Sequence, residues 1–272
     1  MASSPRTAET LADLELIRAA ALEAGELALR RLEQGQVRTW AKSGGSPVTN
    51  ADLEVDALLK QRLLQARPDY GWLSEESLDD SSRLTARRAF VVDPIDGTIA
   101  YIKGRPWWAV SVAVVEQGEP VAGVLHAPAV AETYEAATGQ GARLNGAAIF
   151  AADRAGLEGA AMLADARILR RPEWPRPWPE DLRIETRNSV AYRMALVASG
   201  AFDAVLALSS KCDWDLAAAD LIVREAGAVA TDHLGRSFVY NQPSAKKRSL
   251  VCAGPALHRL ILERVGHIEL PS

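Results

Sequence analysis

The spacing of apolar residues divides the chain into a helical start, a middle rich in strands, and a second half in which helices and strands alternate. Over residues 8–34 apolar side chains recur every three to four positions, which predicts a long amphipathic helix ended by Gly35. Residues 49–52 (TNAD) place an acid three residues after a hydroxyl, as in a capping box, and predict a second helix through about residue 65. We expect the apolar side of this second helix to comprise Leu53, Leu59 and Leu63.

The middle of the chain is rich in valine and alanine in short runs bounded by turn residues, which predicts strands. We expect these strands at residues 89–92, 110–115, 121–125 and 133–137, and around 144–146. Residues 116–119 (EQGE) form a predicted hairpin turn, so most neighbouring strands in this part are expected to be antiparallel.

Helices and strands alternate towards the C-terminus, the pattern of an α/β unit. The expected helices cover residues 188–199, 215–225 and 255–265, and the expected strands cover 203–208, 228–230 and 249–252. Residues 171–180 are rich in proline and tryptophan, so no regular structure is expected there. We place a boundary near residue 150, which divides the chain into halves 1–150 and 151–272.

Composition narrows the class of protein without naming a function. Apolar residues make up 48% of the 272 positions, and 31 basic against 35 acidic side chains leave a net charge of −4. This balance offers no basic excess for nucleic acid or an anionic membrane as a main partner. Two cysteines make no disulfide framework, and neither a signal peptide nor a membrane span is evident. We therefore expect a cytoplasmic protein.

Three acidic segments carry the candidate chemistry: residues 73–77 (LSEES), 91–98 (VVDPIDGT) and 212–215 (CDWD). In the second segment Asp93 ends a strand, and the turn that follows points its carboxylate, that of Asp96 and the carbonyl of Ile95 towards one point. Oxygen ligands of this kind suit a hard cation such as Mg²⁺. The N–H groups after Gly97 would open a helix, a favourable place for phosphate. The alternative is an ordinary Asp-Gly surface turn.

Bringing the acids of the three segments together favours the metal hypothesis. Each like-charge pair at 4 Å costs about 4 kcal/mol at an effective dielectric constant near 20. Two or three divalent cations turn that repulsion into a binding site. The carboxylates concerned are Glu75, Asp93, Asp96 and Asp215.

The three segments, together with residues 47–52 (PVTNAD) and Lys42 upstream of them, resemble the inositol monophosphatase family of metal-dependent, lithium-sensitive phosphatases. The pair at 75–76 matches the family's acidic pair, residues 93–98 match D-P-[IL]-D-G-T, and residues 214–218 match W-D-x-A-A. The resemblance runs from about residue 10 to 265. It implies an α/β (α+β) fold, a layered αβαβα sandwich of the sugar-phosphatase type, and a homodimer. Most metal ligands would lie in the first half, with Asp215 and the substrate-side residues in the second.

The resemblance also implies the ligands of two or three Mg²⁺ ions. Glu75, Asp93 and the Ile95 carbonyl would hold one ion. A second would be held by Asp93, Asp96 and Asp215. Glu75 and outer acids would hold a third ion loosely. The loop after Lys42 carries glycines where the family often has an acid, which would weaken this ion; the alternative is that the length and composition of this loop vary freely without effect.

The same resemblance assigns the reacting groups. Asp52 and Thr98 would form a hydrogen-bonded pair that orients and deprotonates the attacking water, with Glu76 close by as a further catalytic acid. The N–H groups of Gly97 and Thr98 would hold the phosphate of a small phosphorylated substrate. The chain is thereby predicted to be a phosphoric monoester hydrolase.

Substrate choice depends on fewer residues. The inositol-hydrolysing branch usually has a glutamate on the strand before W-D, but residues 205–211 (VLALSSK) contain no acid. This absence, the S-P-V-T-x-A-D run and Tyr240-Asn241 resemble the CysQ-type 3′(2′),5′-bisphosphate nucleotidases. Lys211 would then meet the second phosphate, whereas the basic cluster at 246–248 is better explained as a solvated loop.

We therefore predict hydrolysis of adenosine 3′,5′-bisphosphate to AMP and phosphate. The first alternative is a phosphatase for inositol 1-phosphate or another sugar phosphate, and the second is a binding protein that keeps the fold without catalysis. Trp174 and Trp178 would either approach the substrate or lie in a surface loop. Cys212 has no base beside it in the sequence and is not expected to be a nucleophile.

Overall fold

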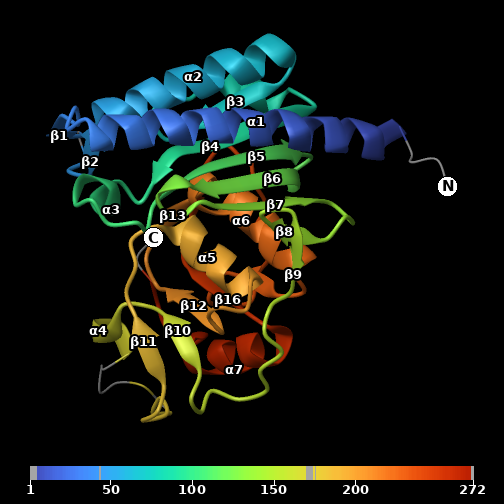
Figure 1. Cartoon of the computed structure of the whole chain (residues 1–272). Helices are drawn as coiled ribbons and strands as arrows, with labels where there is room; N and C mark the ends of the chain where they lie inside the picture. The colour runs from blue at the N-terminus through green and yellow to red at the C-terminus, as the bar shows by residue number, and fades with distance from the viewer. Residues whose placement is uncertain (1–4, 43, 170–173, 175, 271–272) are drawn as a thin grey trace.

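Five layers of alternating helices and sheets make up the computed structural model, which describes residues 5–42, 44–169, 174 and 176–270. From top to bottom in Figure 1 they are two long helices, a large sheet, two central helices, a smaller sheet and a last helix. The predicted αβαβα sandwich is thereby confirmed. No helix in the described ranges is long and apolar enough to cross a membrane.

The outer helices are α1 (Pro5–Glu33) and α2 (Asn50–Ala66), separated by the strands β1 (Thr39–Ala41) and β2 (Pro47–Thr49). The capping box predicted at 49–52 is present: the Thr49 side chain accepts from the N–H of Asp52, and the Asp52 carboxylate accepts from the N–H of Thr49. The expectation for Leu53 is wrong, because it lies on the solvent side of α2 and is 42% exposed. Val55, Leu59 and Leu63 form the buried side instead.

The large sheet has seven strands in chain order, and all neighbouring pairs are antiparallel except β3 with β4. At 117–118 the backbone has φ values of 55° and 86°, as expected for the predicted hairpin turn. The register of β4 against β5 shifts between Asp93 and Asp96, around Pro94. The strands are β3 (Gly71–Ser74), β4 (Arg88–Asp96), β5 (Ala109–Glu116), β6 (Glu119–Ala127), β7 (Glu132–Ala137), β8 (Ala142–Leu144) and β9 (Ala147–Ile149).

The central helices are α5 (Val190–Ala198) and α6 (Asp213–Glu225), and α7 (Pro255–Val265) covers the far side of the smaller sheet (Figure 1). That sheet mixes parallel and antiparallel pairs in the order β11, β10, β12, β16, β14. Its strands are β10 (Ala161–Leu163), β11 (Arg183–Glu185), β12 (Ala204–Ala207), β14 (Val229–Thr231) and β16 (Leu250–Ala253). The short pieces are β13 (Lys211–Cys212), β15 (Lys246–Lys247), α3 (Thr98–Ile102), α4 (Ala166–Leu169), and two 3-10 turns, η1 (Ser81–Leu84) and η2 (Pro128–Val130).

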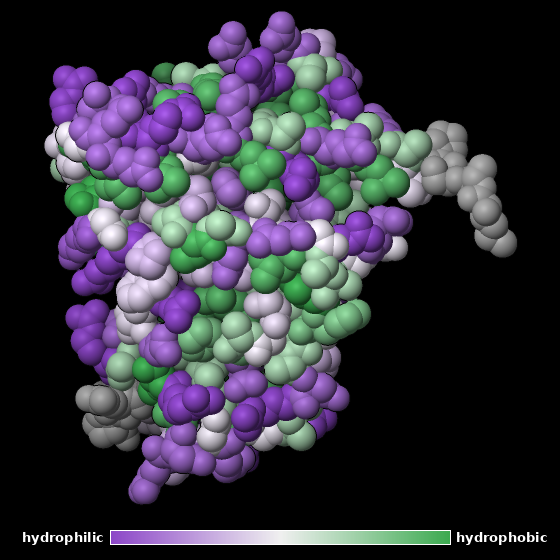
Figure 2. Space-filling model, in the orientation of Figure 1, coloured by the Kyte–Doolittle hydropathy of each residue, from purple (hydrophilic) through white to green (hydrophobic). Residues whose placement is uncertain are grey.

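Three hydrophobic clusters fill the spaces between the layers. The largest contains residues of both sheets and of α5 and α6, so the two halves of the chain share one core. The division near residue 150 stays a prediction. On the face shown in Figure 2, hydrophilic residues dominate the upper and lower ends, with apolar residues scattered between them.

Most predicted elements occur where the pattern placed them, within a few residues at each end. The strands β1, β2, β3, β10, β11, β13 and β15 were not predicted, because runs of two to four residues carry no periodicity. The helix predicted to start at 215 starts at Asp213. Of the segment 171–180, residues 171–173 and 175 lie outside the described part, and 176–180 contain no helix or strand.

Candidate metal and phosphate site

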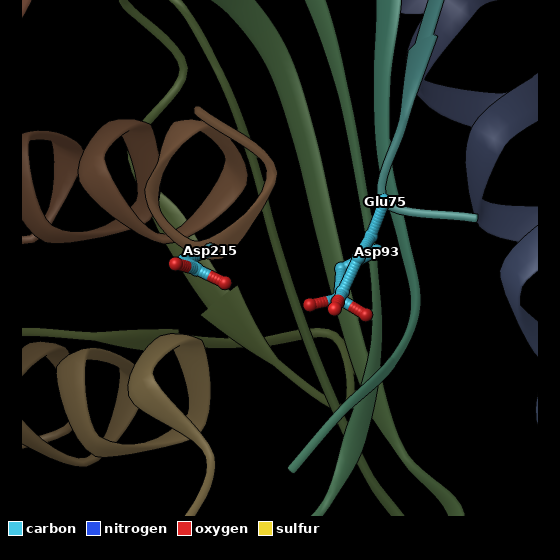
Figure 3. A group of neighbouring side chains, drawn as sticks. All are labelled: Glu75, Asp93 and Asp215. Carbon is cyan, nitrogen blue, oxygen red and sulfur yellow. The ribbon is translucent and has the colours of Figure 1, made fainter. Parts of the chain in front are cut away.

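The structure brings the three acidic segments to one place at the end of the large sheet. Glu75 follows β3, Asp93 lies in β4, and Asp215 lies in the first turn of α6. One carboxylate oxygen of each lies within 4.8 Å of the others. Figure 3 shows the carboxylates of Glu75 and Asp93 side by side, with Asp215 across the gap from them.

The strand register places the first two ligands. In the parallel pair of β3 and β4, Ser74 is opposite Val92, and the N–H of Glu75 continues the ladder by donating to the Val92 carbonyl at 3.3 Å. Glu75 follows Ser74 and Asp93 follows Val92, so two acids lie next to each other at the same end of the sheet. Asp93 is 2% exposed, and its Oδ1 accepts the N–H of Ile95 at 3.0 Å. Backbone hydrogen bonds thus fix Glu75 beside Asp93.

The electrostatics of this group fit a cation. Burial and then the nearby carboxylates, Glu75 first, raise the pKa of Asp93 well above its ordinary range. Burial, and then the charge of Asp96, raises the pKa of Asp215 to about 7. Ionisation of these carboxylates is therefore unfavourable while no cation is bound. A buried cluster of oxygen donors of this kind suits a hard divalent ion such as Mg²⁺.

Asp96 lies in the same pocket but faces α5. Its oxygens accept hydrogen bonds from the Ser189 hydroxyl at 2.5 Å and from the N–H groups of Val190 and Ala191 at 3.3 and 2.7 Å. Within the described residues it is therefore not in the group of three acids whose oxygens converge. A carboxylate offers about four lone-pair sites, so these bonds leave acceptor capacity for a metal.

The turn after Asp96 has the backbone shape that the sequence predicted. Gly97 has φ +94°, and a Cβ there would lie 2.9 Å from the carbonyl oxygen of Trp107, so a side chain is excluded. Thr98 then begins α3, whose first N–H groups have no partner inside the helix. The Ile95 carbonyl faces the same turn, because it accepts the Thr98 hydroxyl at 3.2 Å.

These residues line a pocket of about 200 Å³. The acidic side chains, the α3 turn and residues 46–47 all contribute to its wall. Its lining comprises Ser46, Pro47, Glu75, Asp93, Asp96, Gly97, Thr98, Ile99, Asn188 and Asp215.

The predicted pair of Asp52 and Thr98 is formed. The Thr98 hydroxyl lies 3.3 Å from Asp52 Oδ1, while Oδ2 accepts the N–H and hydroxyl of Thr49 at 2.8 and 2.5 Å. Burial raises the pKa of Asp52, with the bonds from Thr49 acting against it. The capping box therefore fixes the carboxylate that faces Thr98.

Lys42 belongs to the site, although it was predicted only as part of a motif. Its ammonium lies 2.7 Å from Glu75 Oε1 and 2.7 Å from Glu76 Oε1. Burial raises the pKa of Glu76 to about 7, and Lys42 opposes the rise. Glu76 thus faces Lys42 rather than the group of three acids.

The lysine predicted to bind the second phosphate of the substrate, Lys211, does not line the pocket. Its ammonium donates to Ser209 and Ser210 within its own loop. Burial lowers its pKa, and the charge of nearby Asp215 opposes this. Arg193 was missed: this arginine of α5 is 8% exposed, and Asp96 and Asp215 oppose the lowering of its pKa by burial. In the sequence, an arginine among the apolar residues of the predicted helix at 188–199 could have drawn attention to it.

Contacts and burial bear on three further interpretations. The cluster at 246–248 is not simply a solvated loop, because Lys247 is 10% exposed and forms an ion pair with buried Asp213. Trp178 lies 5.6 Å from Trp174 between ring centroids, and both pack against the third hydrophobic cluster, beside the small sheet and α7. Burial raises the pKa of Cys212 to about 12, so its thiol stays protonated.

Comparisons with known proteins identify a family for the chain. A profile of the inositol monophosphatase family matches residues 11–269. A histidinol-phosphatase of Chlorobaculum parvum is 31% identical over 94% of this chain and 98% of its own length, and an inositol-1-monophosphatase of Rhizobium meliloti is 35% identical over 69% and 73%. The crystal structure of extragenic suppressor protein SuhB from Bartonella henselae superposes with a TM-score of 0.81 at 26% identity, covering 94% of this chain and 99% of that one.

Proposed function

The chain belongs to the inositol monophosphatase family and is a phosphatase, and from this premise we propose that it hydrolyses a small phosphomonoester with the help of Mg²⁺. The observation that carries the proposal is the convergence of Glu75, Asp93 and Asp215 within 4.8 Å. Glu75, Asp93 and the Ile95 carbonyl would hold one ion, and Asp93, Asp96 and Asp215 would hold a second. A third ion near Glu75 would have to compete with the ammonium of Lys42.

When bound, Mg²⁺ supplies a lowered pKa for the attacking water and positive charge for the phosphate oxygens. The protein's own groups handle the proton. The Thr98 hydroxyl is placed to accept a proton from water and to donate its own to Asp52 Oδ1 at 3.3 Å. Since burial raises the pKa of Asp52, this carboxylate takes up a proton more readily than an exposed one.

The α3 turn would orient the phosphate. The N–H groups of Gly97 and Thr98 open a helix at the pocket, where an anion is favoured. Gly97 has φ +94° and no space for a Cβ, so this turn requires glycine at the position where the backbone would approach the phosphate.

For the substrate we propose adenosine 3′,5′-bisphosphate, cleaved to AMP. The support is the absence of an acid over 205–211 and the two cations, Arg193 and Lys211, whose charges interact with Asp96 and Asp215. A second phosphate would add an anionic partner for Arg193, on which the charges of those two carboxylates act but which, like Lys211, does not line the pocket.

Histidinol phosphate and inositol 1-phosphate are the competing substrates, because relatives carry those names. We keep the fold-retaining binding protein as a third outcome. We also propose a homodimer in the cytoplasm and inhibition by Li⁺. Sedimentation and a lithium titration would test the oligomeric state and the inhibition.

The test is phosphate release with Mg²⁺ from four compounds: adenosine 3′,5′-bisphosphate, inositol 1-phosphate, fructose 1,6-bisphosphate and histidinol phosphate. We expect kcat/KM for the nucleotide to exceed the others by at least about a hundredfold, which corresponds to about 2.7 kcal/mol. A preference for another compound would overturn the nucleotidase proposal alone. Failure to hydrolyse any of them, with Mg²⁺ still bound, would favour the binding protein.

A further inference from the structure

The first residue of α6, Asp213, is a fully buried carboxylate that the proposed reaction does not use. Its Oδ1 forms an ion pair with the ammonium of Lys247, and its Oδ2 accepts the backbone N–H of Asn241 at 2.7 Å. Its own N–H donates to the carbonyl of Ala245 at 2.9 Å. Three contacts from one segment, 241–247, therefore hold the start of α6.

Asn241 is itself held in place from the other half of the chain. Its φ is +53°, in the left-handed region, and its side chain accepts the Arg83 guanidinium at 2.7 Å and donates to the Arg83 carbonyl at 3.2 Å. Arg83 is 1% exposed and lies in η1. The stretch from Glu75 to η1, residues 75–84, is called the Glu75 segment. A chain of contacts thus joins the Glu75 segment to α6.

The direction of Asp215 depends on the same turn. Its Oδ2 accepts the N–H of Cys212 at 2.7 Å, so the backbone at 212–213 orients the carboxylate. Lys247, whose ammonium also lies 5.6 Å from the ring centroid of Tyr240, is opposite Lys211 in the pairing of β13 with β15. Breaking a buried ion pair by removing one partner leaves an uncompensated charge, so the turn would rearrange.

We propose that Asp213 is a positioning residue for Asp215, and that Lys247, Asn241 and Arg83 hold it. We call these four residues the α6 brace. The inference rests on the proposed function, since it takes Asp215 as a ligand of Mg²⁺. A shift of the first turn of α6 would move Asp215 away from Glu75 and Asp93 and weaken the metal site.

The variant Lys247→Met separates positioning from simple electrostatics. Removing a positive charge near the site would by Coulomb attraction alone tighten Mg²⁺ binding, whereas loss of the brace weakens it. We expect calorimetry of the full chain to show an affinity for Mg²⁺ about 10- to 100-fold lower, the usual effect of losing a group that orients a ligand. Turnover should recover at high Mg²⁺. Unchanged or tighter binding would overturn the proposal.

Asp220→Asn is the matched control. Asp220 is a second buried acid of α6, bonded to the Tyr240 hydroxyl at 3.0 Å and outside the brace. We expect a changed melting temperature and an affinity for Mg²⁺ within about twofold of wild type. An effect as large as that of Lys247→Met would mean that any disturbance of α6 weakens the site, and would overturn the specific role of Asp213.

Asn241→Gly tests the brace even if Lys247→Met does not fold. Glycine adopts the positive φ without strain and keeps the N–H that Asp213 accepts, so the change removes the contacts with Arg83. We expect about fivefold weaker Mg²⁺ binding, and an unchanged affinity would overturn the brace. Wild-type protein that neither binds Mg²⁺ nor releases phosphate would instead overturn the proposed function.

Discussion

The two sides of the acidic site are held in different ways. Glu75 and Asp93 belong to adjacent strands, where the register of β3 and β4 places them side by side. Asp215 belongs to a helix from the other half of the chain, and its position depends on a capping contact and on the α6 brace. Hydrogen bonds between strands therefore position one side of this site, and side-chain contacts position the other. The two sides should therefore differ in their tolerance of mutation.

The largest effect is expected for Asp93→Asn, on the strand side. Asp93 is buried against the other three carboxylates, so its loss should lower kcat by about a thousandfold or more, or about 4 kcal/mol. Because the ionised form is unfavourable there, the metal-free variant should melt higher than wild type near pH 8. Steady-state kinetics and thermal melts measure both effects. Rates near wild type would show that Asp93 is no ligand.

Thr98→Val should lower kcat by about two orders of magnitude, since a general base contributes 10²–10⁴-fold. KM should change little, because the backbone N–H of residue 98 remains. Asp52→Asn should behave similarly, and the double variant should be no worse than either, since groups that act as a unit are not additive. Additive losses in kcat would contradict the pairing of Thr98 with Asp52.

Asp-to-Glu exchanges compare the two sides directly. Asp93 is 2% exposed at the position of β4 where the register shift begins, so an added methylene has no space, and about hundredfold weaker Mg²⁺ binding is expected. Asp215 is half-buried in a helix turn held by side chains, so the turn can shift, and about tenfold weaker binding is expected. Calorimetry gives both affinities. Equal losses would remove the distinction between the two sides.

Stability should depend on pH in opposite ways without and with Mg²⁺. The pKa values of Asp215 and Glu76 are raised to about 7, so these acids stabilise the fold while protonated and lose that contribution as the pH rises towards 7. The melting temperature without metal should therefore fall between pH 5 and pH 8. Mg²⁺ needs deprotonated ligands, so the stabilisation that it gives should grow over the same range.

The size of the metal effect follows from mass action. At a hundredfold excess of Mg²⁺ over its Kd, binding adds about 2.7 kcal/mol. For a chain of this length that is a rise in melting temperature of about 5–10 °C at pH 8. Asp215→Asn should remove most of the rise. If Mg²⁺ raised the melting temperature equally at pH 5 and pH 8, the raised pKa values of Asp215 and Glu76 would be contradicted.

The strand side of the site was predictable from sequence, because short motifs carry it. The acid at a strand end, the proline, the glycine and the capping box at 49–52 each have a local physical cause, and all take the expected shape. The contacts of Asp96 with α5 and of Asp213 with Lys247 were not predictable. The contacts of Asp96 join residues 93 to 95 positions apart, and that of Asp213 joins residues 34 positions apart, so no local pattern in the sequence specifies either.

The smallest effect is expected for Lys211→Ala, at the outer edge of the α6 side. Its ammonium already donates to Ser209 and Ser210, so a second phosphate of the substrate must compete with those bonds. We expect about a fivefold rise in KM for adenosine 3′,5′-bisphosphate, or about 1 kcal/mol, with kcat unchanged. KM for inositol 1-phosphate should not move. Lys246→Ala, an exposed neighbour on β15, is the matched control.

A fall in kcat would change the interpretation of Lys211. Uniform binding of substrate and transition state raises affinity without accelerating the reaction, so a residue that only recognises the second phosphate affects KM alone. A lower kcat would instead mean that Lys211 acts through Asp215, whose charge interacts with it. Lys211 would then belong with the α6 brace, and the cation that recognises a second phosphate would have to be Arg193.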